Sequence, residues 1–100
     1  MAYAIFCLDK PNAVQLRLDN RAAHLDFAKS WGDAIAIGGP LLSEPDDDSE
    51  PEMIGSLIIL DVDTRGEVDR FIACDPYGIA GLFDSVTVHP YKIALGKNVG

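Results

Sequence analysis

The order in which two kinds of apolar pattern follow one another most constrains the fold of this chain of 100 residues. Short apolar runs typical of strands alternate with stretches in which apolar residues recur every three or four positions, which is typical of helices. This pattern predicts strands at 3–8, 34–42, 54–62 and 83–95, and helices at 13–31 and 64–75. The order β-α-β-β-α-β indicates one ferredoxin-like α+β domain over residues 1–100, with a four-stranded antiparallel sheet and two helices on one face.

Local signals refine the predicted boundaries. Asn12 is a candidate N-cap for the first helix, and Thr64 with Glu67 three residues later is typical of a capping box. In the first helix we expect one buried apolar stripe that includes Val14, Leu18, Ala22, Leu25 and Ala28. The Gly38-Gly39-Pro40 segment predicts a bend within the second strand, and Asp75-Pro76 predicts the end of the second helix.

The apolar pattern of the third strand indicates a partner chain. Leu57-Ile58-Ile59-Leu60 is apolar at consecutive positions, so both faces of the sheet are apolar there, yet two helices cover one face. Burial of each Leu or Ile side chain contributes roughly 1.5–3 kcal/mol, so an uncovered face is unfavourable. We therefore expect a homodimer in which a second copy packs on the open sheet face.

Net charge excludes some partners. The formal net charge is -8, but six of the 16 acidic residues lie in the segment 44–52, which has no basic residue and two prolines. We expect this segment to be a solvated loop, and the rest of the chain to be close to neutral. Nucleic-acid binding needs clustered Lys and Arg, so it is not expected. The acidic segment lacks the ligand spacing and turn glycine of an EF-hand loop, so we expect no metal site.

Targeting signals are also missing from the sequence. The apolar stretch at the N-terminus is short and has no basic residues before it, and no stretch reaches the ~20 apolar residues of a membrane span. We expect no membrane association and a cytoplasmic location. Cys7 and Cys74 each lie in an apolar stretch, which predicts two reduced, buried thiols.

Arg17, Arg21 and His24 lie at i, i+4 and i+7 of the first helix and therefore on one stripe. Two interpretations of His24 are open. It is either a boundary residue that hydrogen-bonds to the backbone, or a general acid/base, since imidazole titrates near neutral pH. Two neighbouring arginines favour the neutral ring, which can accept a proton.

Asp75 is a candidate partner for His24. It ends the second helix, which packs on the same face of the predicted sheet as the first. An acidic residue at a helix C-terminus is unfavourable with respect to the helix dipole, so Asp75 serves either the turn that follows or a site.

Several motifs together resemble the YciI-like family, and the resemblance spans nearly the whole chain. They are Arg21-Ala22-Ala23-His24-Leu25, Gly38-Gly39-Pro40, Ala73-Cys74-Asp75-Pro76-Tyr77 and Ala80-Gly81-Leu82. The resemblance implies a ferredoxin-like protomer that forms a dimeric α+β barrel, with a His-Asp active-site pair at His24 and Asp75. The family is related to muconolactone-isomerase-like proteins and includes dehydrochlorinases that act on chlorinated aromatic intermediates, while most members have no established reaction. The acidic segment is a local departure from this pattern.

The resulting hypothesis is a cofactor-independent enzyme of the lyase or isomerase type that acts on a small, anionic molecule. His24 transfers a proton, Asp75 either orients His24 or balances its charge, and Arg17 or Arg21 attracts an anionic group. Gly39, Pro40 and Tyr77 form the wall of the cleft. No cofactor is expected. The alternative is a non-catalytic dimer that binds a metabolite or regulates through the same pocket, and a purely structural interaction protein is a third interpretation.

Overall fold

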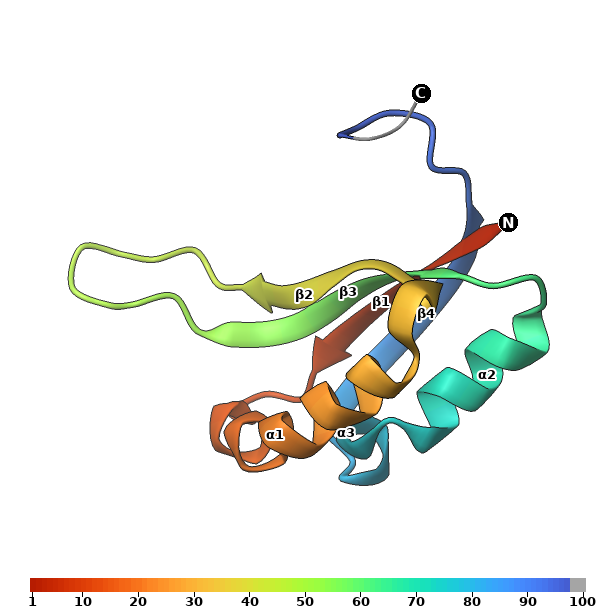
Figure 1. Cartoon of the computed structure of the whole chain (residues 1–100). Coiled ribbons are helices and arrows are strands. Elements are labelled where there is room, and N and C mark those ends of the chain that lie inside the picture. The colour runs from red at the N-terminus through yellow and green to blue at the C-terminus, as the bar shows by residue number, and fades with distance from the viewer. Residues whose placement is uncertain (98–100) are drawn as a thin grey trace.

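The computed structural model describes residues 1–97 and has the predicted order of elements (Figure 1). The elements are β1 (Ala2–Asp9), α1 (Val14–Ser30), the short 3-10 helix η1 (Gly32–Ala34), β2 (Ile35–Leu42), β3 (Met53–Asp61), α2 (Arg65–Cys74), α3 (Pro76–Ile79) and β4 (Phe83–Tyr91). The strands form one sheet in the order β2-β3-β1-β4, and every neighbouring pair is antiparallel. The prediction of a ferredoxin-like α+β fold is confirmed.

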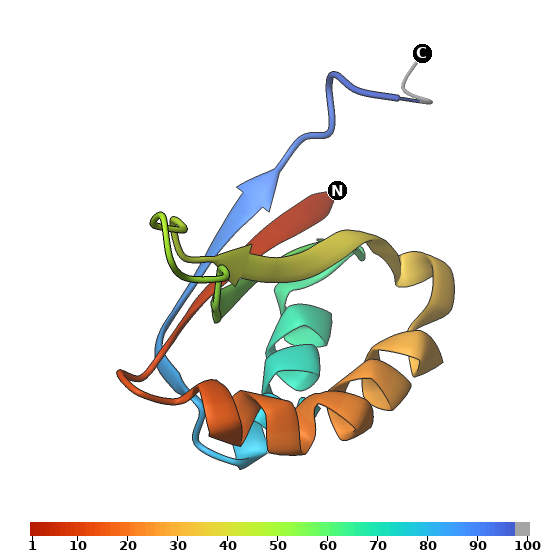
Figure 2. The same cartoon turned by 90° about the vertical axis from the view of Figure 1, so that its left-hand side faces the viewer.

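The helices lie on one face of the sheet, and the core fills the space between them and the strands (Figure 2). Residues that alternate along β1 and β3 point into this space, as the two-residue period of a strand requires. The buried apolar side chains that form the core cluster come from β1, β3 and α2: Tyr3, Ile5, Cys7, Ile58, Leu60, Val68 and Phe71. The predicted capping box is present at the start of α2, where Thr64 and Glu67 hydrogen-bond to one another's backbone N–H groups.

The predicted apolar stripe of α1 is wrong. Leu18 is 48% exposed and Leu25 is 37% exposed, whereas Arg17 is 2% exposed. The helix is therefore rotated so that Arg17 and His24 face the sheet, while Leu18 is on the exposed side and Leu25 lies at the edge of the inward face. The physical reason is that Arg17 has a buried ionic partner, Asp9, at the end of β1, which offsets the cost of burying its charge.

Four further predictions need correction, and each has a local cause. The N-cap of α1 is Ala13, because Asn12 has a positive φ of 58° and belongs to the preceding turn. Gly38-Gly39-Pro40 continues β2 without a bend, since Pro40 is tolerated on this edge strand. β4 ends at Tyr91, which pairs with Ala2, the first residue of its partner strand. Cys74 is exposed, because it lies at the end of α2 beyond Phe71, the last buried residue of that helix.

The acidic segment connects β2 to β3 and is exposed, as predicted. Two hydrogen bonds between Ser43 and Glu52, of 2.8 and 2.9 Å, close its base. Figure 1 shows that it extends away from the helices, so its charges lie apart from the residues that face the sheet. Among residues 1–97, no helix has the length and apolar character needed to cross a membrane.

Candidate active site

His24 and Asp75 meet between α1 and the junction of α2 with α3. The distance from Nδ1 of His24 to Oδ1 of Asp75 is 2.9 Å, and the side chains are 12% and 5% exposed. Asp75 is also the N-cap of α3, where its carboxylate accepts a hydrogen bond from the backbone N–H of Tyr77, and Pro76 occupies the first position of that helix. Asp75 therefore has both predicted roles: it caps the turn into α3, and it pairs with His24.

This contact orients the imidazole of His24. An ionised carboxylate accepts hydrogen bonds and does not donate them, so Nδ1 of a neutral His24 ring carries the proton. Nε2 then has a free lone pair, and it is the atom that can accept a proton from another molecule. Asp75 in turn stabilises the positive charge that develops when the ring is protonated.

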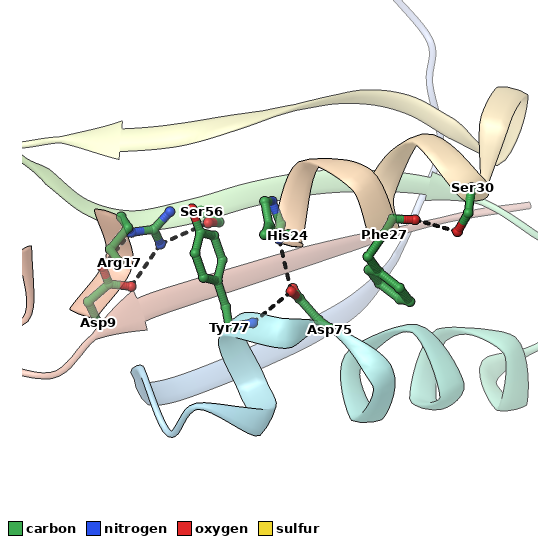
Figure 3. A network of polar contacts seen from close by, with 8 residues as sticks. All are labelled: Asp9, Arg17, His24, Phe27, Ser30, Ser56, Asp75 and Tyr77. Atoms are coloured by element: carbon green, nitrogen blue, oxygen red, sulfur yellow. Dashed lines mark hydrogen bonds and ion pairs between the residues drawn. The ribbon is translucent and has the colours of Figure 1, made fainter. Parts of the chain in front are cut away.

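Tyr77 lies between Arg17 and His24 (Figure 3). Its ring stacks on the His24 ring at a centroid distance of 4.0 Å and an interplanar angle of 15°, and the Arg17 guanidinium carbon lies 4.5 Å from the ring centroid. Burial raises the pKa of Tyr77 above its ordinary value, against the opposing effect of the nearby Arg17 charge. Tyr77 is therefore a neutral phenol at physiological pH, and its ring fixes the plane of the imidazole.

Arg17 is held by protein groups through Nε and Nη2. Its Nε and Nη2 donate to the Asp9 carboxylate at 2.7 and 2.8 Å, and Nη2 also donates to Oγ of Ser56 at 2.9 Å. Burial alone would lower the pKa of Arg17, but the hydrogen bonds and charge of Asp9 outweigh it, so the pKa is raised. Arg17 thus remains charged, and its pairing with Asp9 leaves less net positive charge for a substrate anion than an unpaired arginine offers.

A pocket of about 140 Å³ lies against His24 and Tyr77. Arg21 is exposed on α1 and lines this pocket, and it forms no ion pair within residues 1–97. The predicted wall residues Gly39 and Pro40 line it too. Arg17 and Ser56 also line it. The remaining lining residues were not predicted for the site: Leu25, Ala28, Ile35, Gly38, Met53 and Ile58.

The sequence analysis missed Asp9 and Ser56. A signal for Ser56 exists, since it is the one hydroxyl residue in the apolar strand segment 54–60 and shares a face with Ile58 by the two-residue period. Asp9 has a weaker signal, an acidic residue at the end of an apolar strand.

Cys7 is not a nucleophile for this site. Burial, and secondarily the nearby charge of Asp75, raise the pKa of its thiol to about 12. The reactive form of cysteine is the thiolate, so Cys7 is inert near neutral pH. Within residues 1–97, no three side chains of His, Cys, Asp or Glu form a group that could hold a metal ion.

The fold and the site define a class of small ferredoxin-like α+β proteins with a His-Asp pair beside a ring-sized pocket. Residues 1–92 match the YCII-related domain, and the chain belongs to that family.

Three similar proteins illustrate the family. Protein YciI of Escherichia coli is 28% identical over 95 residues, which cover 92% of this chain and 97% of that protein. An uncharacterised protein of Haemophilus influenzae is 33% identical over the same shares of both chains. Among solved structures, 5-chloro-2-hydroxyhydroquinone dehydrochlorinase (TftG) of Burkholderia phenoliruptrix, in complex with 2,5-dihydroxybenzoquinone, is 35% identical. It superposes with a TM-score of 0.85 over 92% of this chain and 94% of the dehydrochlorinase chain.

Proposed function

We propose that this protein is a cofactor-independent lyase or isomerase that moves a proton on a small cyclic substrate. The observation that carries the proposal is the 2.9 Å contact between His24 and Asp75 at the wall of a pocket. It supplies a base whose free nitrogen has a fixed direction, and a carboxylate that stabilises the protonated base. The similarity to a dehydrochlorinase that binds a dihydroxybenzoquinone supports a chlorinated hydroquinone as the first substrate to test.

The proposed elimination consumes no external oxidant or reductant. The species that eliminates is the keto tautomer of the substrate, in which the carbon that bears chlorine also carries a hydrogen. Nε2 of His24 takes a proton from a ring hydroxyl, the electron pair of the O–H bond forms a carbonyl, and the neighbouring ring electron pair moves to form a new double bond to the carbon that loses chloride. Chloride leaves with the electron pair of the carbon–chlorine bond. The substrate thus loses hydrogen chloride, the proton resides on His24, and its release to solvent restores the enzyme.

Of the two candidate arginines, Arg17 and Arg21, Arg21 is the one proposed to bind the anion. Both arginines line the pocket, but Arg17 is paired with Asp9 at 2.7 Å, whereas Arg21 is exposed and has no ion-pair partner within residues 1–97. A guanidinium in this position attracts a phenolate or enolate and stabilises the negative charge that proton removal creates.

The test is turnover of 5-chloro-2-hydroxyhydroquinone, followed as chloride release and as the absorbance of the quinone product. We expect activity in the unaltered protein, and a loss of about 10²–10⁴-fold in kcat for His24→Gln, since this is the usual contribution of a positioned base. Asp75→Asn should lose activity in the same direction.

The matched control is Asp69→Asn, the same substitution at a 62% exposed aspartate on α2. It should leave kcat unchanged. Full activity in both His24→Gln and Asp75→Asn would contradict the proposed proton transfer. Binding of the ring compounds without any turnover would instead favour a non-catalytic metabolite-binding or regulatory module.

We also propose that a second copy of the chain covers the open face of the sheet. By the strand register, Phe6 and Leu8 of β1, Leu57 of β3 and Ile37 of β2 point away from the helices, and each is between 38% and 68% exposed. No element within residues 1–97 covers this face, as Figure 2 shows. Two copies related by a two-fold axis would bury both apolar faces against each other.

Light scattering tests the homodimer. The expected mass is twice the 10.8 kDa of one chain at micromolar concentration. Leu57→Asp places a charge in the proposed interface and should shift the mass to that of one chain, whereas Leu18→Asp on the exposed side of α1 should not. A single-chain mass for the unaltered protein would contradict the proposal.

A further inference from the structure

Ser56 is a buried polar residue of the pocket that the His-Asp mechanism does not use. It lies on the central part of β3, opposite Cys7 of β1 and Pro40 of β2, and is 4% exposed. The strand register turns its side chain toward the helices, and it lines the pocket together with Arg21, His24 and Tyr77. A hydroxyl at this position is costly to bury unless its hydrogen-bonding groups are satisfied.

The hydrogen bond from Arg17 fixes how the Ser56 hydroxyl can act. Nη2 of Arg17 donates to Oγ at 2.9 Å, and both side chains are buried. A guanidinium has no acceptor, so Oγ is the acceptor in this contact, and the hydroxyl proton must point elsewhere. Among residues 1–97, no hydrogen bond donated by this hydroxyl is found. The proton is thus available to a molecule in the pocket.

Arg17 and Asp9 prepare Ser56 for this role. A hydroxyl that accepts a hydrogen bond from a cation is polarised, so the hydrogen bond that it donates is strengthened. Asp9 neutralises Arg17 through contacts of 2.7 and 2.8 Å, so the charged pair stays buried without a ligand. Arg17 is therefore a positioning residue that acts through Ser56.

The size of the pocket limits what Ser56 can hold. A cavity of about 150 Å³ is large enough for benzene, so the volume of about 140 Å³ takes one six-membered ring. The apolar side chains of Ile35, Met53 and Ile58 face such a ring, while His24 and Ser56 provide its polar contacts.

We propose that Ser56 is a substrate-binding residue that donates a hydrogen bond to a carbonyl or oxyanion oxygen on a six-membered ring. This assignment rests on the proposed function and specifies its substrate class, a ring compound whose oxygen gains negative charge as His24 removes a proton. Ser56 donates to that oxygen both when the substrate is bound and when it reacts. Removal of the Ser56 hydroxyl therefore weakens binding as well as turnover.

The experiment is equilibrium binding of 2,5-dihydroxybenzoquinone, measured by titration calorimetry with the full chain. We expect Ser56→Ala to weaken binding about 10–100-fold, the effect of one hydrogen bond to a charged group. Ser56→Thr keeps the hydroxyl and should restore most of the affinity, and Ser49→Ala in the acidic segment should have no effect. A purely structural role would lower thermal stability in Ser56→Ala while leaving the dissociation constant unchanged.

The outcomes separate this inference from the proposed function. Equal affinity for the unaltered protein and Ser56→Ala, or no binding to the unaltered protein, overturns the assignment of Ser56 even if turnover is found. Weakened binding in Ser56→Ala, with rescue by Ser56→Thr, supports the assignment even if no turnover of any chlorinated ring compound is found. In that case the proposed dehydrochlorination is rejected, while Ser56 is retained as a ligand-binding residue.

Discussion

The layer between α1 and the sheet has two ends of opposite character. At the aromatic end, Phe27, Trp31 and Phe71 pack together with centroid distances of 5.1–6.3 Å. At the polar end, Arg17 and His24 of the same helix contact polar groups of the sheet and of α3: Asp9, Ser56, Asp75 and Tyr77. Figure 3 shows the polar residues and, further along α1, Phe27 of the aromatic end.

The difference between the ends separates stability from chemistry. Aromatic packing contributes through burial and ring contacts, and it creates no group that can exchange a proton. A buried ion pair is a poor source of stability, because desolvation offsets much of the attraction between its charges. Leu18 of α1, which could have filled the polar end, is instead 48% exposed, and Leu25 lies at the edge of the pocket. The polar end is therefore explained better by a binding site than by folding.

The largest expected effect is at the aromatic end. Phe71 is 1% exposed and contacts both Phe27 and Trp31, so Phe71→Ala leaves a cavity and should lower the free energy of unfolding by about 4 kcal/mol. Urea denaturation followed by circular dichroism measures it. Leu18→Ala, at a residue that is 48% exposed, is the control and should cost less than about 1 kcal/mol. Equal losses in the two variants would contradict the division between the ends.

A smaller loss is expected when the ion pair at the polar end is broken. Asp9→Asn leaves the charge of Arg17 buried without its partner, and should lower the free energy of unfolding by about 3 kcal/mol. Adding Arg17→Met removes the uncompensated charge and should recover part of this loss. A double variant that is less stable than Asp9→Asn would contradict the idea of an uncompensated charge and would show that Arg17 stabilises the fold through Ser56 and Tyr77.

This contrast also explains what could be predicted from the sequence. The strands and the capping box of α2 follow from local patterns, two-residue alternation and the Thr64-Glu67 spacing, and these were confirmed. The buried face of α1 was predicted wrongly, because a count of apolar residues every three or four positions assigns Leu18 and Leu25 to the core.

Long-range contacts decide the face of α1. Arg17 turns inward because Asp9, eight positions earlier, and Ser56, 39 positions later, both accept its hydrogen bonds. The same limit applies to the site. His24 and Asp75 were selected from their residue types, helix positions and a family resemblance, and they lie 2.9 Å apart across 51 positions of sequence. The pairing of Arg17 with Asp9 could not be predicted, because no sequence pattern near Arg17 indicates which residue it contacts.

Cys7 provides a pH test of the buried layer. Its pKa in the folded protein is about 12, above the ordinary value of 9.0, because burial disfavours the thiolate. The contribution of the buried, protonated Cys7 thiol to the free energy of unfolding is therefore complete below pH 9 and is lost as the pH rises from 9 toward 12. By pH 10 the unfolded thiol has ionised, and the expected loss is about 1.4 kcal/mol. Urea denaturation at pH 8 and pH 10 measures it.

The control for this pH dependence is the other cysteine. Cys7→Ala should remove the loss of stability between pH 8 and pH 10, while Cys74→Ala should leave it unchanged, because Cys74 is exposed. A thiol reagent at pH 8 should label Cys74 in the folded protein and Cys7 only after unfolding. Rapid labelling of Cys7 in the folded protein would contradict its burial.

The smallest expected effect is at the start of α2, the helix that reaches both ends of the layer. The Thr64 hydroxyl accepts a hydrogen bond from the backbone N–H of Glu67, so Thr64→Ala should lower the free energy of unfolding by about 1 kcal/mol. Thr64→Ser keeps the cap and should restore most of this loss. Phe71 and Asp75 follow on the same chain segment, but the hydrogen bond that His24 donates to Asp75 is made at the far end of the helix. Binding of 2,5-dihydroxybenzoquinone should therefore be unchanged in Thr64→Ala. A parallel loss of stability and affinity would mean that the two ends form one cooperative unit, and the separation of stability from chemistry along α1 would have to be abandoned.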